Sequence, residues 1–330
     1  MTSQRGRAGL SRRGLLYGGG ALAAVTALGG GALWGSSAFA EAQAAAGPRF
    51  KLSTAAVKYI REKPVHHTTV LQSFAFDNPH KHIYVLQVVG DGSKGDMCLT
   101  KINYSGTKLG YMFLRGFGHG VGMGVEPVGA DAYIWTETDS NPSSGYGRAI
   151  TRFKFVNKKT LTYGSSSIPV HRPVKGSTSN QPSVDMLNKR LVLRHRVAGV
   201  ARYRVYDLAD AKAGKYGAPL YEFPQVGVKS GEVFQGFCSL GDYVYQMVGT
   251  SYTGESGSNP PSKRGNTYLS SIDMRTGALV ERRWTQAAYS LDFREPEGMA
   301  VQLTSKPRLF MGFASGRSGA RKISLYYKPS

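Results

Sequence analysis

Five polar side chains open five similar stretches of this sequence, and side chains of these types can bind or cleave a polar ligand. Each stretch continues with small residues, a short gap and a hydrophobic run. Amide side chains donate and accept hydrogen bonds, an imidazole can carry a proton near neutral pH, and a carboxyl group can do either. The leading residues are Gln72, His119, Gln181, Gln235 and Glu297, at spacings of 47, 62, 54 and 62 residues.

His119 is the one imidazole among the five, with glycine on both sides, so we expect it to act as a general acid or base. His67 and His195 are candidates for a second proton-transferring group, beside Glu297. Arg194 and Arg294 are candidates for binding an anion, because guanidinium groups fit phosphate and carboxylate geometry. Two alternatives stay open: that His119 is structural, and that the leading residues hydrogen-bond neighbouring blades and seal the channel.

The elements that must position these residues are short strands. Apolar runs such as 82–88, 132–136 and 243–248 are rich in β-branched and aromatic residues and are separated by Gly, Asn, Asp, Ser and Pro. Repetition about every 55 residues predicts an all-β fold, a single five-bladed β-propeller over residues 50–330 with four strands in each blade and a central channel pocket. In such a fold residues 50–60 pair beside 322–328, and the leading residues converge on one mouth of the channel. The competing fold is a pair of β-sandwiches.

The amino-acid composition excludes several classes of protein. The 330 residues hold 42 basic and 21 acidic side chains and are 41% hydrophobic, which excludes global disorder. Two cysteines exclude a disulfide-stapled scaffold and a structural zinc cluster, and we expect Cys98 and Cys238 to be unpaired. No dinucleotide, P-loop or G-x-S-x-G motif is present, and no pair of carboxylates supports a glycosidase.

The N-terminus predicts export. Residues 1–40 combine Arg12-Arg13, a Gly/Ala-rich apolar stretch and an Ala38-Phe39-Ala40 cleavage pattern, as in a twin-arginine signal peptide. A transmembrane anchor is the alternative. Residues 41–49 then form a disordered linker, and the protein is secreted or associated with the cell wall. Without the first 40 residues, 38 basic and 21 acidic side chains remain, a net charge of +17.

The five stretches resemble the teichoic acid biosynthesis protein C family. The likeness rests on Gln72-Ser73-Phe74, Gly118-His119-Gly120, Gln181-Pro182-Ser183-Val184-Asp185, Gln235-Gly236-Phe237 and Glu295-Pro296-Glu297-Gly298, in this order. That family is similar to the five-bladed propeller platform of staphylococcal phage receptor-binding proteins. The resemblance covers about residues 65–328 and implies a propeller that binds or acts on wall teichoic acid or a related polymer.

Charge and resemblance together predict an anionic wall polymer as the partner. Our first hypothesis is a secreted enzyme that cleaves a glycerol-phosphate type teichoic acid, by hydrolysis or by lyase-like attack of a neighbouring hydroxyl. In it, His119, His67, His195 and Glu297 are the catalytic candidates, and Gln72, Gln181, Gln235, Arg194 and Arg294 bind substrate. The alternatives are a non-catalytic, lectin-like module and a polysaccharide lyase or glycoside hydrolase. We expect a monomer that binds no nucleic acid and needs no cofactor, with a metal ion in the channel left open.

Overall fold

The computed structural model describes residues 49–90, 92–165, 168–252 and 265–330. Residues 45–330 form one compact unit, and the account below concerns its described part alone. The expected signal peptide at 1–40 lies outside the described residues, as does all of the expected linker except Arg49.

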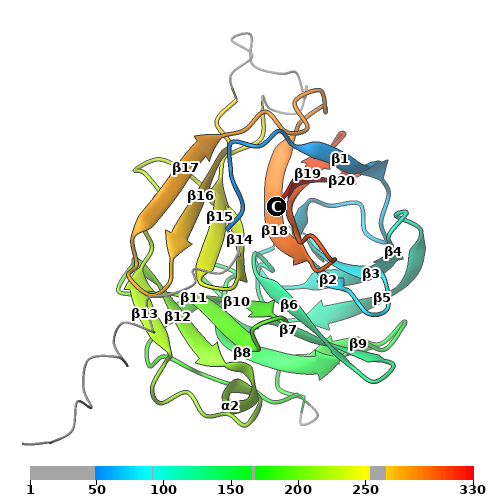
Figure 1. Ribbon diagram of the computed structural model, residues 1–330. Coiled ribbons are helices and arrows are strands. Elements are labelled where there is room, and N and C mark those ends of the chain that lie inside the picture. The colour runs from blue at the N-terminus through cyan, green and yellow to red at the C-terminus, as the bar shows by residue number, and fades with distance from the viewer. Residues whose placement is uncertain (1–48, 91, 166–167, 253–264) are drawn as a thin grey trace, which may run out of the picture. The chain divides into compact units, whose positions relative to one another are not determined.

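The strands form five sheets that follow one another along the chain (Figure 1). Blade one contains β2 (Leu71–Asp77), β3 (His82–Val88), β4 (Met97–Asn103), β5 (Lys108–Arg115) and β9 (Thr160–Thr162); blade two contains β6 (Met123–Val128), β7 (Asp131–Ser140) and β8 (Gly147–Lys154). Blade three contains β10 (Thr178–Asp185), β11 (Arg190–Val197), β12 (Val200–Asp207) and β13 (Tyr221–Pro224), with the short helix α2 (Leu208–Lys212) between the last two. Blade four contains β14 (Phe234–Leu240), β15 (Tyr243–Val248), β16 (Tyr268–Asp273) and β17 (Leu279–Trp284); blade five contains β18 (Glu295–Gln302), β19 (Arg308–Ser315), β20 (Lys322–Pro329) and β1 (Val57–Lys63).

The first and last strands of the unit close the ring. β1 pairs antiparallel with β20, so blade five takes strands from both ends of the described chain. The pairing begins at Val57 rather than at Phe50, because Phe50 and Leu52 leave the sheet and bury their side chains between blades four and five. The ring of Phe50 meets that of Tyr245 edge to face, with centroids 5.3 Å apart. The predicted five-bladed propeller is therefore confirmed, as is its closure by strands from both ends, but the closing strand is 57–63 rather than 50–60.

Apolar side chains between neighbouring blades form the core. The described residues make five buried clusters, and each one joins two adjacent blades. Trp135 of β7, for example, is fully buried against Leu191 and Leu193 of β11, which joins blades two and three. Burying one such side chain contributes about 1.5–3 kcal/mol, so the alternating pattern of each strand holds the ring together.

Blade two departs from the expected four strands. It has three, and β9, which follows its last strand in the sequence, pairs in parallel with β5 of blade one. Asn157 favours this pairing, since its Oδ1 accepts a hydrogen bond from the backbone N–H of Tyr111 on β5 at 3.0 Å. The free edge of β8 is covered by a bridge between Ile150 and His171. The expectation of five equal blades is corrected accordingly.

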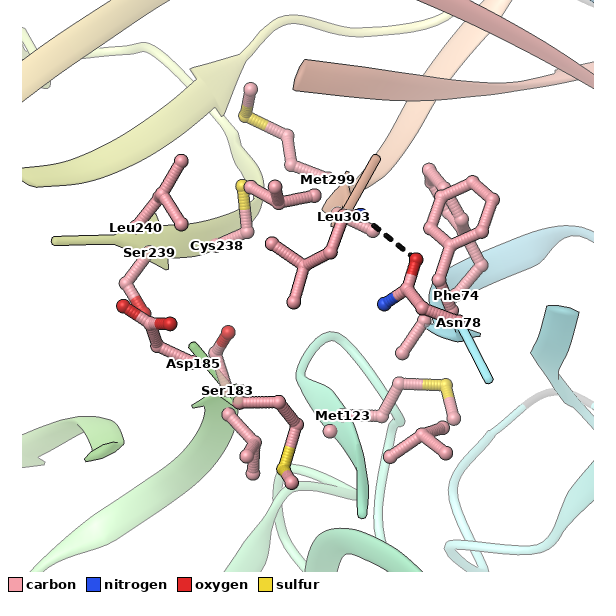
Figure 2. A pocket seen from close by; sticks show the side chains of 18 residues that line it. Phe74, Asn78, Met123, Ser183, Asp185, Cys238, Ser239, Leu240, Met299 and Leu303 are labelled. Atoms are coloured by element: carbon pink, nitrogen blue, oxygen red, sulfur yellow. Dashed lines mark hydrogen bonds between the residues drawn. The ribbon is translucent and has the colours of Figure 1, made fainter. Parts of the chain in front are cut away.

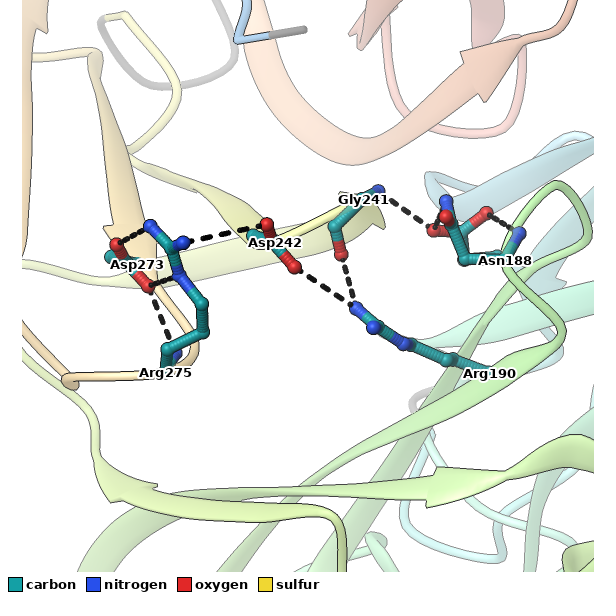
Figure 3. Close-up of polar contacts among 7 residues, drawn as sticks. Asn188, Arg190, Gly241, Asp242, Asp273 and Arg275 are labelled. Atoms are coloured by element: carbon teal, nitrogen blue, oxygen red, sulfur yellow. Dashed lines mark hydrogen bonds and ion pairs between the residues drawn. The ribbon is translucent and has the colours of Figure 1, made fainter. Parts of the chain in front are cut away.

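Polar contacts tie blades three and four together where their inner strands end (Figure 3). Arg190 Nη1 donates to the carbonyl oxygen of Gly241 at 2.7 Å, and the N–H of Gly241 donates to Asp185 Oδ2 at 2.8 Å. Asp242 lies 3.5 Å from Arg190 and 3.8 Å from Arg275. This network fixes the ends of the strands that line the channel.

Cys98 on β4 and Cys238 on β14 are free and buried, in different blades as expected. Burial raises the pKa of the Cys98 thiol to about 11, so it stays protonated at neutral pH. Within the described segments, no helix has the length and apolar character needed to cross a membrane.

Candidate functional site

The inner strands β2, β6, β10, β14 and β18 line the channel, and their N-terminal ends carry a repeated distortion. In four blades the pairing of the inner strand with its neighbour shifts register next to the leading polar residue. The shift spans Gln72, Gln235 and Glu297 in blades one, four and five, and it ends at Gln181 in blade three. A bulge of this kind takes a side chain out of the regular ladder and re-aims it.

The residues that follow the leading residues touch from blade to blade. A Cβ atom on Gly236 would lie 2.7 Å from the Cα of Gly298, and one on Gly298 would lie 2.8 Å from the Cα of Ser73. Ser73 Oγ in turn donates to the carbonyl oxygen of Gly120 at 2.6 Å. The leading residues therefore lie at one level around the channel, at the end that we call the N-terminal mouth.

The three leading glutamines hydrogen-bond within their own blades rather than to neighbouring ones. Gln72 donates to the Leu71 carbonyl oxygen at 3.2 Å, and Gln235 donates to that of Gly249 at 2.7 Å. Gln181 Oε1 accepts from Arg194 Nη1 at 2.9 Å. All three side chains are buried, so these amides lie beneath the surface of the mouth and support its shape.

Arg194 is a buried cation without a carboxylate partner among the described residues. Its guanidinium donates to the amide oxygens of Gln181 and Gln225 and lies 3.9 Å from the ring centroid of Phe234. Only 2% of the residue is exposed, and burial lowers its pKa to about 10. A cation held by neutral groups alone favours an incoming anion, which would supply the missing countercharge.

Glu297 is a buried acid, and burial disfavours its charged form as it does that of Arg194. Burial, and then the neighbouring Glu295, raise the pKa of Glu297 well above its usual value. Its Oε2 atom is buried and has no hydrogen-bond partner within the described structure. A protonated carboxyl group at this place can donate a proton or a hydrogen bond.

His119 precedes β6 and packs against Tyr146, which precedes β8. The two ring centroids are 4.8 Å apart with the planes inclined by 32°. Burial lowers the pKa of His119, so the imidazole is neutral at neutral pH and can accept a proton.

The Tyr146 hydroxyl connects charged groups from three blades. Burial and Glu137 raise its pKa, Arg194 lowers it, Glu297 raises it further and Arg196 lowers it. Each of these charges contributes to the electrostatic environment of the Tyr146 hydroxyl. Of the predicted site residues, His119 packs against Tyr146, and the charges of Arg194 and Glu297 both act on its hydroxyl.

Glu137 on β7 is a site residue that the sequence analysis missed. Its carboxylate is fully buried and accepts the backbone N–H groups of Gly120 and Gly147, each at 2.5 Å. Burial raises its pKa to about 7, against the lowering effect of those hydrogen bonds and of the N–H groups of His119 and Val121. Glu137 therefore holds the backbone that carries His119. The available signal was an acid directly after the apolar run 132–136, inside the same strand.

Arg294 lies in a second buried setting, between blades four and five. Its side chain donates to the Ala287 carbonyl oxygen at 2.9 Å and to Thr267 Oγ1 at 2.5 Å, and it lies between the rings of Tyr252 and Phe313. Its Nη2 atom has no partner within the described structure, and burial lowers the pKa to about 10. No contact within the described residues links Arg294 to Tyr146.

The other two histidine candidates lie apart from this group. His67 donates or accepts at Thr69 Oγ1 over 2.8 Å, in the segment that leads to β2, and burial followed by Arg115 lowers its pKa. His195 follows Arg194 on β11, so strand alternation points it to the opposite face of blade three. Both of its ring nitrogens are buried without partners, and burial lowers its pKa to about 4.

The C-terminal half of the channel is mainly apolar and almost filled (Figure 2). All five inner strands line a cavity of about 30 Å³, with side chains that include Phe74, Met123, Cys238, Met299 and, beyond β18, Leu303. That volume holds about one water molecule, so a polymer does not thread through the ring. Within the described residues, no cluster of three or more His, Cys, Asp or Glu side chains is placed to hold a metal ion.

Comparison with known proteins agrees with this geometry. Residues 70–327 match the family described as phage 5-bladed beta propeller receptor binding platform domain. The chain belongs to this family. The resemblance inferred from the five stretches is therefore confirmed, and with it the relation of this platform fold to cell-wall glycopolymers.

Two proteins similar to this chain agree with the family match. The protein named "Putative major teichoic acid biosynthesis protein C" from Bacillus subtilis (strain 168) is 26% identical over 293 residues, which are 84% of this chain and 63% of that protein. The tail fiber of Staphylococcus aureus phage P68 superposes with a TM-score of 0.67 at 19% identity, over 84% of this chain and 54% of the fiber. The chain thus spans less than two thirds of either relative, and the likeness to the fiber concerns the fold.

Proposed function

We propose that this chain binds a glycerol-phosphate type teichoic acid at the N-terminal mouth and cleaves its phosphodiester backbone. One observation carries the proposal: His119 packs against Tyr146, and two further candidates, the buried Arg194 and Glu297, both influence the pKa of that tyrosine. Displaced pKa values give His119 the form of a base and Glu297 that of an acid at the same pH. Arg194 supplies the charge that a phosphoryl group needs.

In the proposed reaction, His119 removes the proton from a glycerol hydroxyl next to the phosphodiester. The oxygen attacks phosphorus and forms a cyclic phosphate, while the bond from phosphorus to the next glycerol breaks. Glu297 gives its proton to that leaving oxygen, and proton exchange with solvent restores both groups. When water attacks in place of the hydroxyl, the same two groups act and the product is a linear phosphomonoester.

Location outside the cytoplasm is part of the proposal. The twin-arginine pattern of residues 1–40 would deliver the folded propeller to the compartment that holds wall polymers. Once residues 1–40 are removed, the net charge of +17 would favour association with a polyanion.

A second candidate, binding without cleavage, is favoured by the family match, since the family is described as a receptor-binding platform. The deciding experiment incubates the protein with purified glycerol- and ribitol-type teichoic acids and analyses the soluble products by mass spectrometry. Cyclic phosphates would support intramolecular attack, and linear phosphomonoesters alone would support attack by water. Binding to the polymer with no product would overturn cleavage and leave the binding role.

A further inference from the structure

A groove with charged side chains in its lining lies beside the N-terminal mouth, on the side of blades one and two. Its volume is about 490 Å³, within the range of sites that hold small ligands. The lining includes Lys94 from the segment between β3 and β4, Asp139 from β7, Arg148 from β8 and Tyr163 from the segment after β9. Nothing in the proposed reaction uses these side chains.

One buried carboxylate holds Arg148, which lines the groove, and Arg172, which lies beside the lining. Asp139 accepts from Arg148 Nη2 at 2.5 Å and from Arg172 Nη2 at 2.7 Å. Although burial alone would raise the pKa of Asp139, the two guanidinium groups lower it, so the carboxylate stays charged. The side chains of Arg148 and Arg172 remain 47% and 50% exposed, which leaves N–H groups for a ligand. A guanidinium fixed in this way loses little conformational entropy when it binds an anion.

The groove carries excess positive charge. Lys94 of the lining is exposed, and behind it on blade one Asp96 accepts from Arg115 Nη1 at 2.8 Å, a neutral pair outside the lining. Lys94 and Arg148 of the lining, with Arg172 beside them, therefore stand against the lining carboxylate Asp139. A surplus of two charges suits a dianionic or repeating phosphate ligand.

The backbone places this groove next to His119. Gly116 lines the groove and precedes His119 by three residues, so their Cα atoms lie within about 11 Å. Arg148 follows Tyr146 by two residues, and their Cα atoms lie within about 7 Å. A Cβ atom on Gly92 would lie 3.3 Å from His119 Nδ1, and the next residue, Ser93, lines the groove.

We propose that this groove is a second phosphate subsite, which binds the phosphate next along the polymer from the one at the mouth. The inference rests on the proposed function, because it assumes a polymer whose phosphates are joined by short glycerol bridges. A single phosphate occupies the mouth alone, whereas an oligomer engages both places. The groove thus makes the protein selective for chains over monomers.

The test measures binding of glycerol 3-phosphate and of purified poly(glycerol phosphate) by calorimetry. In the double variant Arg148→Gln/Arg172→Gln, each glutamine can still donate to Asp139. We expect polymer affinity to fall roughly 10- to 100-fold, as for losing hydrogen bonds from charged donors, and monomer affinity to stay within about twofold. Lys94→Ala removes an exposed cation and leaves no buried carboxylate without a partner. It should weaken binding of the polymer but not of the monomer.

The matched control is Arg202→Gln/Arg204→Gln. These two arginines also share one carboxylate, Glu222, at 3.0 Å each, but they lie on β12 of blade three. Equal polymer affinity in the groove variants and the control would overturn the subsite while leaving the proposed function intact. A wild-type protein that binds no teichoic acid would overturn the proposed function and the subsite with it.

Discussion

At the scale of single residues, His119 gives the sharpest test. Glutamine stands at the equivalent position in three other blades, so His119→Gln should preserve the fold and most of the polymer binding. If the imidazole transfers a proton, turnover should fall roughly 10²–10⁴-fold. The measurement is product release by mass spectrometry beside a binding isotherm. Unchanged turnover in a folded variant would remove His119 from the chemistry and return attention to His67.

A second residue-scale prediction concerns His195, whose pKa is lowered to about 4 by burial. As the pH falls from about 6.5 to 4, the unfolded chain gains a proton here and the folded chain does not. The site should therefore remove about 3 kcal/mol from the free energy of unfolding across this window. His195→Leu should flatten the pH profile by that amount in urea titrations, because the contributions of the other groups cancel in the difference. Parallel profiles for the two proteins would contradict the assigned burial.

The sequence identifies some of these residues and not others for a physical reason. Gln72, His119, Gln181, Gln235 and Glu297 recur in register with the repeats, so they stand out against the apolar strands around them. Glu137 has no counterpart in the repeat, and its role depends on backbone N–H groups that no residue letter encodes. Strand alternation separates Arg194 from His195, but the sequence does not tell which face meets the channel.

At the scale of elements, the bulges near the leading residues make glycine necessary at Gly298. This residue has a φ of 75°, and an added Cβ would collide with the backbone of Ser73 in the next blade. Gly199 has a φ of 80° but open space around it, which makes it a matched control. Gly199→Ala should cost about 1–2 kcal/mol from backbone strain, and Gly298→Ala about 1–3 kcal/mol more from the clash.

Chemical denaturation of the two glycine variants measures the difference directly. Equal losses of unfolding free energy would mean that adjacent inner strands can move apart without cost, against the close ring of contacts at the N-terminal mouth. A larger loss for Gly298→Ala would show that the mouth is rigid, as a catalytic arrangement requires.

The positions of the strands could be predicted because a short alternating or fully apolar run between turn residues is compatible with few structures other than a β-strand. All five hydrophobic runs after the leading residues are the second strands of their blades. The pairing of β9 with blade one could not be predicted from the sequence. It depends on a contact between Asn157 and Tyr111 of β5, which are 46 positions apart in the chain. Edge pairing of this kind leaves almost no trace in local sequence.

At the scale of the whole molecule, charge is distributed so that cations remain after the acids are paired. Glu126, Asp139 and Glu222 are each in contact with two basic side chains. Such pairs neutralise part of the basic surplus locally and hold guanidinium groups in place. The unpaired cations then set the long-range field that a polyanion meets.

This charge predicts that polymer binding is steeply dependent on salt. Screening shortens from roughly 10 Å at 0.1 M to about 3 Å at 1 M ionic strength, so attraction between the protein and distant phosphates should vanish across that range. The affinity for poly(glycerol phosphate) should fall with each increase in salt, while binding of an uncharged glycan should hardly change. The contact of a single phosphate with buried Arg194 should be less sensitive, because salt screens a buried pair of charges much less than an exposed one. An affinity for polymer that stays constant between these salt concentrations would mean that recognition depends on the buried mouth alone and not on the surface charge.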